Sequence, residues 1–203
     1  NKESDMSSKA WLSTVLDGGK VRCDACSHFC VLEGGEVGKC GVRTVRDGGL
    51  ELDVYGLIAA ANIDPIEKKP LYHFLPGSRI LSVGTVGCNF SCSFCQNYEI
   101  SQYPKEHDGD LKGSYLSPQE LVRTAKEQGI PSIAFTYNEP AIYFEYAYDV
   151  MKLAKEQGIK TVFVTSGYES KAALEYSRGL LDGMNIDLNH LATIFTKIFV
   201  EQG

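Results

Sequence analysis

The sequence lacks a long apolar run, an excess of basic residues and the basic-then-apolar order of a secretory signal at its start. No stretch approaches the roughly 20 apolar residues that a membrane-spanning helix needs. The net charge is -6 and the sequence pI about 5.3, whereas a general nucleic-acid-binding protein carries a basic face. We therefore expect a cytoplasmic protein that does not bind membranes or nucleic acid.

Cysteine is the one residue type whose distribution is unusual in this chain of 203 residues. There are seven cysteines, so disulfides alone could not pair them all. Clustered thiols in a cytoplasmic protein are typical of metal ligands or redox groups. They form two groups: Cys23, Cys26, Cys30 and Cys40, and then Cys88, Cys92 and Cys95.

Changes in composition divide the chain into three parts. Residues 1–20 form a polar N-terminal segment, with a short helix expected near Ala10 to Leu16. Residues 21–78 form a cysteine-rich metal-binding module, which includes a strand at 50–60 and then a connecting loop broken by prolines. Residues 79–203 form an α/β region.

In the α/β region, apolar segments alternate with segments that have helix-start and helix-end residues. For example, Ser117 can cap a helix, Pro118 suits its first turn and Gly129 can end it. The strands are expected at 79–86, 131–137, 159–167 and 183–188, and the helices at 117–129, 139–158 and 170–180.

An internal repeat supports a parallel sheet or barrel. AKEQGIPSIAFT begins at Ala125 and AKEQGIKTVFVT at Ala154, an offset of 29 residues. Each copy ends a helix at glycine and continues into an apolar strand, which is the unit of parallel α/β folds. Coincidence in a common helix-ending sequence is the alternative. In such folds the active site lies at the carboxyl ends of the strands.

The segment GCNFSCSFCQN places Cys88, Cys92 and Cys95 within eight residues, directly after the first of these strands. Thiolates suit zinc and iron–sulfur clusters, and a closed site of either kind usually takes four protein ligands. Three ligands on a four-iron cluster would leave one iron open for reaction. A structural zinc site completed by a distant histidine or cysteine is the alternative.

This C-x3-C-x2-C spacing after the first strand of an α/β barrel resembles the radical S-adenosylmethionine (radical SAM) enzymes. The resemblance implies a 4Fe–4S cluster on Cys88, Cys92 and Cys95, whose open iron binds S-adenosylmethionine. The reduced cluster cleaves this cofactor to a 5′-deoxyadenosyl radical, which abstracts hydrogen from a substrate. The aromatic residue before the last cysteine, here Phe94, is expected near the adenine; packing beneath the loop is the alternative.

A closer resemblance rests on KVRCDACSHFCVLEGGEVGKCGVR, DPIEKKPLYHFLPGS, SVGTVGCNFSCSFCQNYEISQ and AFTYNEP. These segments resemble the radical SAM enzymes of the AmmeMemoRadiSam system, which are related to the pyruvate formate-lyase activating enzymes. The activase barrel has six strand–helix units, of which four can be placed here. The fold we predict is therefore a partial, C-terminally truncated (β/α) radical SAM barrel with a small N-terminal cysteine-rich module.

By position, the resemblance assigns further cofactor contacts to the strand ends. TYNEP lies where the family meets the amino end of S-adenosylmethionine, which makes Thr136, Asn138 and Glu139 candidates. A carboxylate in the first turn of a helix also favours the helix dipole, so Glu139 has a structural alternative.

Two later strand ends carry the remaining candidates. Thr165 and Ser166 follow the third strand, and Asp187 matches an aspartate after the fourth. Capping of the next helix or loop is the alternative role for all three. The chain departs from the activases at Val164, where they usually carry Asp, and at Asn189, where they carry Lys. Both departures argue against a monovalent cation site of the activase kind, and the tail after Asn189 matches nothing in the group.

Cys23, Cys26, Cys30 and Cys40 follow C-x2-C-x3-C-x9-C, four thiols within 18 residues. This suits a closed four-ligand site, and a metal would add folding energy to a module with short apolar runs. Zinc and an auxiliary iron–sulfur cluster both fit the spacing, and unligated thiols remain an alternative. His28 could replace one thiol.

We therefore predict a radical SAM enzyme, with a ferredoxin- or flavodoxin-type electron donor and an unidentified protein or small-molecule substrate. The alternative is a two-site zinc or iron–sulfur module for binding or electron transfer, without radical chemistry.

Overall fold

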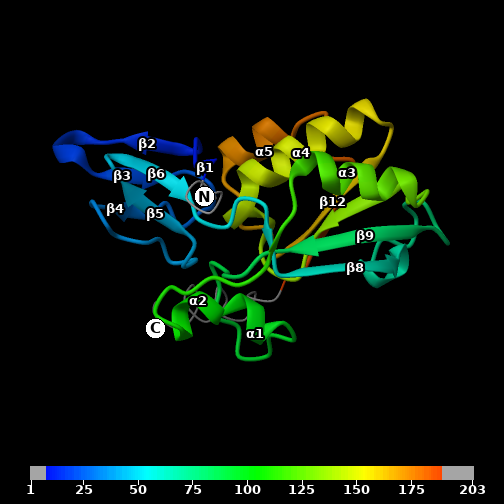
Figure 1. Cartoon of the computed structure of the whole chain (residues 1–203), viewed down its shortest axis with the longest axis horizontal. Helices are drawn as coiled ribbons and strands as arrows, with labels where there is room; N and C mark the ends of the chain where they lie inside the picture. The colour runs from blue at the N-terminus through cyan, green and yellow to red at the C-terminus, as the bar shows by residue number, and fades with distance from the viewer. Residues whose placement is uncertain (1–7, 189–203) are drawn as a thin grey trace, which may run out of the picture.

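The computed structural model describes residues 8–188, and its centre is a five-stranded sheet with the strand order β13-β12-β11-β9-β8 (Figure 1). Its strands are β8 (Ala60–Pro65), β9 (Arg79–Gly84), β11 (Ser132–Phe135), β12 (Lys160–Thr165) and β13 (Gly183–Ile186). Four of them are parallel, and β8 runs antiparallel to β9 along one edge. The four parallel strands are those expected from the sequence. Among the described residues the sheet is open, so its closure into a barrel remains a prediction.

Three helices, α3 to α5, cover one face of this sheet (Figure 1). The helices of the described chain are α1 (Tyr98–Ser101), α2 (Tyr103–Glu106), α3 (Pro118–Glu127), α4 (Phe144–Glu156) and α5 (Lys171–Ser177). The capping box at the start of α3 is formed by Ser117 and Glu120, as helix-start rules lead one to expect. The helix predicted at 139–158 begins differently, with a 3-10 turn, η3 (Pro140–Tyr143), before α4. None of the described helices has the length and apolar character of a membrane span.

The sequence repeat corresponds to a structural repeat. In both copies the helix is followed by a glycine with positive φ, Gly129 (62°) and Gly158 (70°), as in left-handed helix caps. The strands that follow then pair in parallel, with Ser132 opposite Lys160. The repeat therefore builds two adjacent strands of one sheet, as the predicted alternation of helix and strand implies.

The connecting segment before β9 is more ordered than predicted. The region expected to be a proline-broken loop begins with β8 and continues into a 3-10 helix, η2 (Ile66–Lys68). Proline is tolerated at the end of β8 because this strand lies at the sheet edge. This segment also covers the second face of the sheet, where Ile66 packs with Ile80, Ala134 and Val162.

Asp64 joins this segment to the sheet by polar contacts. Its carboxylate is paired with Lys68 at 3.0 Å and with the buried Lys69 at 3.1 Å, and it accepts a hydrogen bond from Ser82. Burial alone would raise the pKa of Asp64, but the hydrogen bonds from the two lysines hold it below its ordinary value. The charge of Asp64 therefore stabilises the edge strand.

The N-terminal part contains short antiparallel strands rather than the predicted helix near Ala10 to Leu16. They are β1 (Ser8–Lys9), β2 (Ser13–Val15), β3 (Val21–Cys23), β4 (Val31–Leu32), β5 (Arg43–Arg46), β6 (Gly49–Leu52) and β7 (Leu57–Ile58). β7 pairs with β10 (Ser114–Tyr115), a short strand before α3. A further 3-10 turn, η1 (Asp17–Gly19), joins β2 to β3. The predicted strand at 50–60 is also wrong, because a turn with Gly56 at φ 74° divides it.

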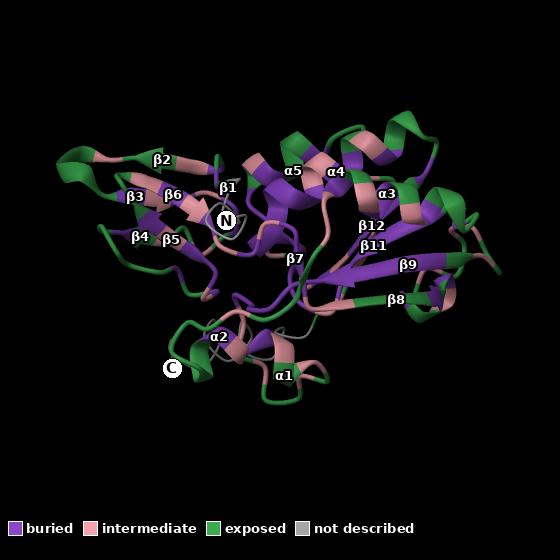
Figure 2. Cartoon of the chain, viewed as in Figure 1, coloured by how far each residue is buried: buried purple, intermediate pink, exposed green. Residues whose placement is uncertain are grey.

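This N-terminal part has more apolar packing than its short apolar runs suggested. Val21, Val42, Leu52 and Val54 are fully buried, and they belong to the same apolar cluster as the face of the sheet under α3 and α4. Figure 2 shows the strands of that sheet, such as β9, as largely buried. The core is continuous, so the cysteine-rich segment packs on the α/β body.

A buried ion pair crosses the same junction. The guanidinium of Arg43 on β5 is paired with the carboxylate of Glu145 on α4, and both side chains are almost completely inaccessible. Arg43 also donates to the carbonyl oxygen of Ile142 at 2.8 Å, and Glu145 accepts from the amide of Leu12 at 3.1 Å. The ion pair thus provides hydrogen-bond partners both for a backbone amide of the N-terminal part and for a backbone carbonyl next to α4.

Candidate active site

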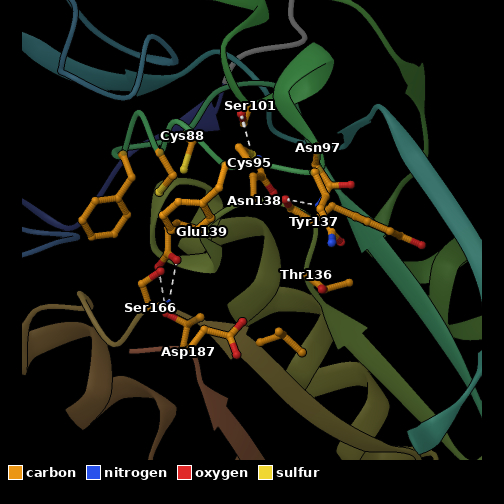
Figure 3. A pocket seen from close by; sticks show the side chains of 16 residues that line it. Cys88, Cys95, Asn97, Ser101, Thr136, Tyr137, Asn138, Glu139, Ser166 and Asp187 are labelled. Atoms are coloured by element: carbon orange, nitrogen blue, oxygen red, sulfur yellow. Dashed lines mark hydrogen bonds between the residues drawn. The ribbon is translucent and has the colours of Figure 1, made fainter. Parts of the chain in front are cut away.

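One cavity of about 390 Å³ lies at the carboxyl ends of the four parallel strands (Figure 3). Its volume is in the range of small-molecule sites. The three cysteines of the loop after β9 line it, with all seven residues proposed as cofactor contacts. The full lining is Cys88, Phe90, Cys92, Phe94, Cys95, Gln96, Asn97, Ser101, Thr136, Tyr137, Asn138, Glu139, Val164, Thr165, Ser166 and Asp187. The structure therefore brings every candidate of this group to one place.

The cysteine loop begins at a glycine that no other residue could replace without strain. Gly87 has φ 87°, and a Cβ there would lie 2.6 Å from both the carbonyl oxygen of Cys40 and a methyl group of Val42. Next to it, the amide of Cys88 donates to the carbonyl oxygen of Cys40 at 3.2 Å. The cysteine loop thus packs against the N-terminal cysteine-rich segment.

The three thiols of this loop differ in their surroundings. Cys88 is buried, and burial raises the pKa of its thiol to about 11. Burial also raises the pKa of the half-buried Cys92. The Sγ of Cys95 lies 3.4 Å from the Oγ of Ser101. Burial therefore favours the neutral thiols of Cys88 and Cys92, so a metal that binds these two would displace protons.

Lys105 on α2 is the cation near these thiols. Its Nζ donates to the carbonyl oxygen of Phe90 at 3.1 Å and to the side chain of Gln102 at 3.0 Å. Burial lowers its pKa, while the neighbouring thiols Cys88 and Cys92 act in the opposite direction. Nothing in the sequence pattern indicated this residue.

Asn138 holds the cysteine loop in place. Its Nδ2 donates to the carbonyl oxygen of Thr85 at 2.9 Å, to the Thr85 hydroxyl at 3.1 Å and to the carbonyl oxygen of Gly87 at 2.8 Å. Its Oδ1 is buried and has no hydrogen-bond partner among the described residues. The Nδ2 of Asn138 therefore fixes the segment that follows β9. Its Oδ1 is left as a hydrogen-bond acceptor for a bound molecule.

Glu139 connects the ends of β11 and β12. One carboxylate oxygen accepts from the Thr165 hydroxyl and the other from the Ser166 amide, both at 2.7 Å. Burial, the largest influence, raises the pKa of Glu139 to about 7. Glu139 precedes η3 without capping it by its side chain. Thr165 and Ser166 do not cap the next helix either, since Ser170 caps α5.

Phe94, Thr136 and Asp187 occupy different depths of the cavity. Thr136 is buried at the end of β11, and Asp187 is half-buried and accepts from the side chain of Asn185 at 2.9 Å. Phe94 is 60% exposed, so the alternative that it packs beneath the loop is wrong. Val164, the departure from the activase pattern, also lines the cavity, and Asn189 lies outside the described residues.

Tyr137 and Asn97 also line the cavity, although the sequence reading did not single them out. Tyr137 has φ 72°, a conformation that is strained for an aromatic residue and concentrated at functional sites. Its carbonyl oxygen accepts from Asn97 at 3.0 Å (Figure 3). Its hydroxyl accepts from Asn62 at 3.0 Å. Tyr137 lies in the motif TYNEP, and Asn97 ends the motif GCNFSCSFCQN. Their places in these two motifs are the sequence feature that could have identified them.

The three-thiol loop has room for an iron–sulfur cluster. Within residues 8–188, no three His, Cys, Asp or Glu side chains are placed to hold one metal ion. In a cluster each thiolate binds a different iron, so the three sulfurs need not converge on one point. The open cavity beside Cys88, Cys92 and Cys95 leaves room for the rest of the cluster and for a ligand.

The four upstream cysteines line a different cavity. Cys23, Cys26, Cys30 and Cys40 surround a space of about 10 Å³, together with His28, Arg43 and Asn89. The ring of His28 lies 2.9 Å from the carbonyl oxygen of Asn89 through its Nε2. None of the described cysteines forms a disulfide.

Comparison with known proteins agrees with this geometry. Residues 82–201 match the model of the radical SAM superfamily, which is more than half of the chain. An uncharacterized protein of Methanocaldococcus jannaschii, MJ0808, is 39% identical over 183 residues, which are 90% of this chain. The chain spans about half of that relative, 54% of its length. The family match covers the cysteine loop and all four parallel strand ends, and the chain belongs to the radical SAM superfamily.

Proposed function

We propose that this protein is a radical SAM enzyme of the AmmeMemoRadiSam type, related to the pyruvate formate-lyase activating enzymes. The observation that supports this most is the single cavity at the strand ends, which joins the three thiols to polar groups from three further strands. A binding or electron-transfer module would account for the cysteines but does not need such a cavity. A cytoplasmic location, an oxidoreductase activity and a ferredoxin- or flavodoxin-type donor belong to the same proposal.

In this proposal Cys88, Cys92 and Cys95 hold a 4Fe–4S cluster. The cluster supplies one electron and an open iron for S-adenosylmethionine. The chain's own part is to fix the loop and to shield it: Asn138 holds the loop end, and the buried position of Cys88 keeps water away on one side. Lys105 offsets part of the negative charge of the thiolates.

Polar groups at the strand ends would orient the cofactor. Glu139 is held by Thr165 and Ser166, so its carboxylate can accept from the amino group of S-adenosylmethionine without reorganising. The unpartnered Oδ1 of Asn138 offers a second acceptor. Thr136 and Asp187 line the cavity on either side, and the exposed Phe94 is available to stack on the adenine.

The test is anaerobic reconstitution with iron and sulfide, followed by reduction with dithionite. We expect a cluster whose electron paramagnetic resonance signal shifts when S-adenosylmethionine is added, and formation of 5′-deoxyadenosine. Changing Cys92 to Ala should remove both the shift and the product. Product formation that survives this change would refute the assignment.

A second test addresses Glu139. Glu139→Gln should weaken S-adenosylmethionine binding to the oxidised cluster by about 10- to 100-fold, because a hydrogen bond to a charged group is lost. Glu127→Gln, on the exposed end of α3, is the matched control and should bind as the wild type does. Equal binding by both variants would remove Glu139 from the cofactor site.

A further inference from the structure

The four upstream cysteines converge from separate segments on one small, closed space. Cys23 ends β3, Cys26 and Cys30 lie in the turn that leads to β4, and Cys40 precedes β5. The turn is closed by the amide of Cys23, which donates to the carbonyl oxygen of Cys30 at 2.8 Å. Cys23, Cys26 and Cys40 are buried, and all four residues line the cavity of about 10 Å³.

A buried, unpartnered amide lines the same space and points to an occupant. Asn89 is 6% exposed, and its Nδ2 has no hydrogen-bond partner of ordinary geometry among the described residues, although the side chain lies against Cys26. Its other atom, Oδ1, lies 3.9 Å from the Sγ of Cys88. A buried N–H without a partner is costly, and a metal-bound thiolate would accept from it.

A fixed positive charge also lines this cavity. The guanidinium of Arg43 is buried there, and its Coulomb partners include Cys23 and Cys40 as well as Glu145. Four thiolates around a divalent ion carry a net charge of about −2, which is expensive to bury without a neighbouring cation. Arg43, whose charge is also shared with Glu145, places a cation beside the thiolates.

We propose that Cys23, Cys26, Cys30 and Cys40 form a closed thiolate site for a single structural metal ion of the zinc class. The cavity has the size of one ion or water, whereas a four-iron cluster is several times larger. The thiols are not at metal-ligand distances in the described structure, so binding a metal would require their side chains to move closer together. Histidine is not needed, because His28 is engaged with the Asn89 carbonyl.

This site also bears on the loop that carries Cys88. The carbonyl oxygen of Cys40 accepts the Cys88 amide at 3.2 Å, and Asn89 lies between the two groups of thiols. A metal on Cys40 would therefore hold the first residue of the radical SAM loop. This consequence rests on the proposed function, whereas the metal site itself does not.

Metal analysis of the anaerobically purified chain tests the proposal without relying on activity. We expect about one zinc per chain in the wild type, and also in a variant with Cys88, Cys92 and Cys95 all changed to Ala. In the variant Cys23→Ser/Cys40→Ser the zinc should be lost. Four irons with sulfide in the first variant would overturn the single-ion site, and the absence of both metals would overturn the site altogether.

Because a variant without its structural ligands can fail to fold, cobalt provides an independent measurement on the chain with intact upstream cysteines. Co²⁺ added to the metal-depleted Cys88/Cys92/Cys95→Ala variant should give intense thiolate charge-transfer bands and tetrahedral d–d bands at one equivalent. Zinc should then displace the cobalt and bleach both sets of bands. Weak octahedral bands, or no saturation at one equivalent, would contradict a closed four-thiolate site.

Discussion

Replacing Asn138 with Ala is expected to loosen the cysteine loop. The side-chain amide makes three hydrogen bonds, two of them to the carbonyl oxygens of Thr85 and Gly87. Both of these residues are buried, so water cannot readily replace the lost donor. An unsatisfied buried polar group costs about 1–3 kcal/mol, so losing the donor to both carbonyls should destabilise the chain by about 2–6 kcal/mol.

Thermal unfolding under anaerobic conditions measures this cost. For a chain of this size 1 kcal/mol corresponds to a Tm shift of roughly 2–4 °C, so Asn138→Ala should unfold roughly 4–24 °C below the wild type. Its iron content after reconstitution should fall as well, because the loop that holds three ligands is no longer fixed. Asn62→Ala is the control, since it removes only one exposed hydrogen bond, to the hydroxyl of Tyr137.

The outcome can separate two roles for Asn138. If Asn138→Ala unfolds within about 1 °C of the wild type and takes up the same iron, the loop-holding argument is refuted, because surface substitutions have effects of that size. A loss of S-adenosylmethionine affinity alone would then identify Asn138 as a cofactor contact. A loss of both stability and iron would identify it as the residue that positions the loop.

Three further predictions follow from single contacts. Gly87→Ala should strain the backbone by about 1–3 kcal/mol and lower the iron retained after reconstitution, since its Cβ would meet the Cys40 carbonyl. Glu145→Leu should cost about 3–5 kcal/mol in denaturant unfolding by leaving Arg43 unpaired, and adding Arg43→Met should recover most of it. Asp64→Asn should be less stable than the wild type at pH 7. Because the folded-state pKa of Asp64 lies below its unfolded value of 3.8, this difference should shrink as the pH falls below about 4, and equal stabilities at pH 7 would contradict it.

Local sequence signals predicted an element correctly where residues within or next to that element determine its start and end. The capping box at Ser117 and the glycines after α3 and α4 fixed two helices, and the repeat fixed two neighbouring strands. The same reasoning failed for β2 and β8. These short strands depend on pairing with β3 and β9, and no local pattern records that pairing.

The spacing of Cys88, Cys92 and Cys95 and the order of strands and helices were sufficient to predict a metal site at one edge of the sheet. The resemblance built on this spacing predicted the radical SAM superfamily. The spacing of the cysteines and the alternation of strands and helices are local features of the sequence, so they can be predicted from it. Only the tertiary structure decided which atoms meet. Asn138 turned out to hold the loop, and Glu139 to be fixed by Thr165. The hydrogen bond from Cys88 to Cys40 likewise joins residues that are far apart in the chain. Such contacts follow from how the core packs.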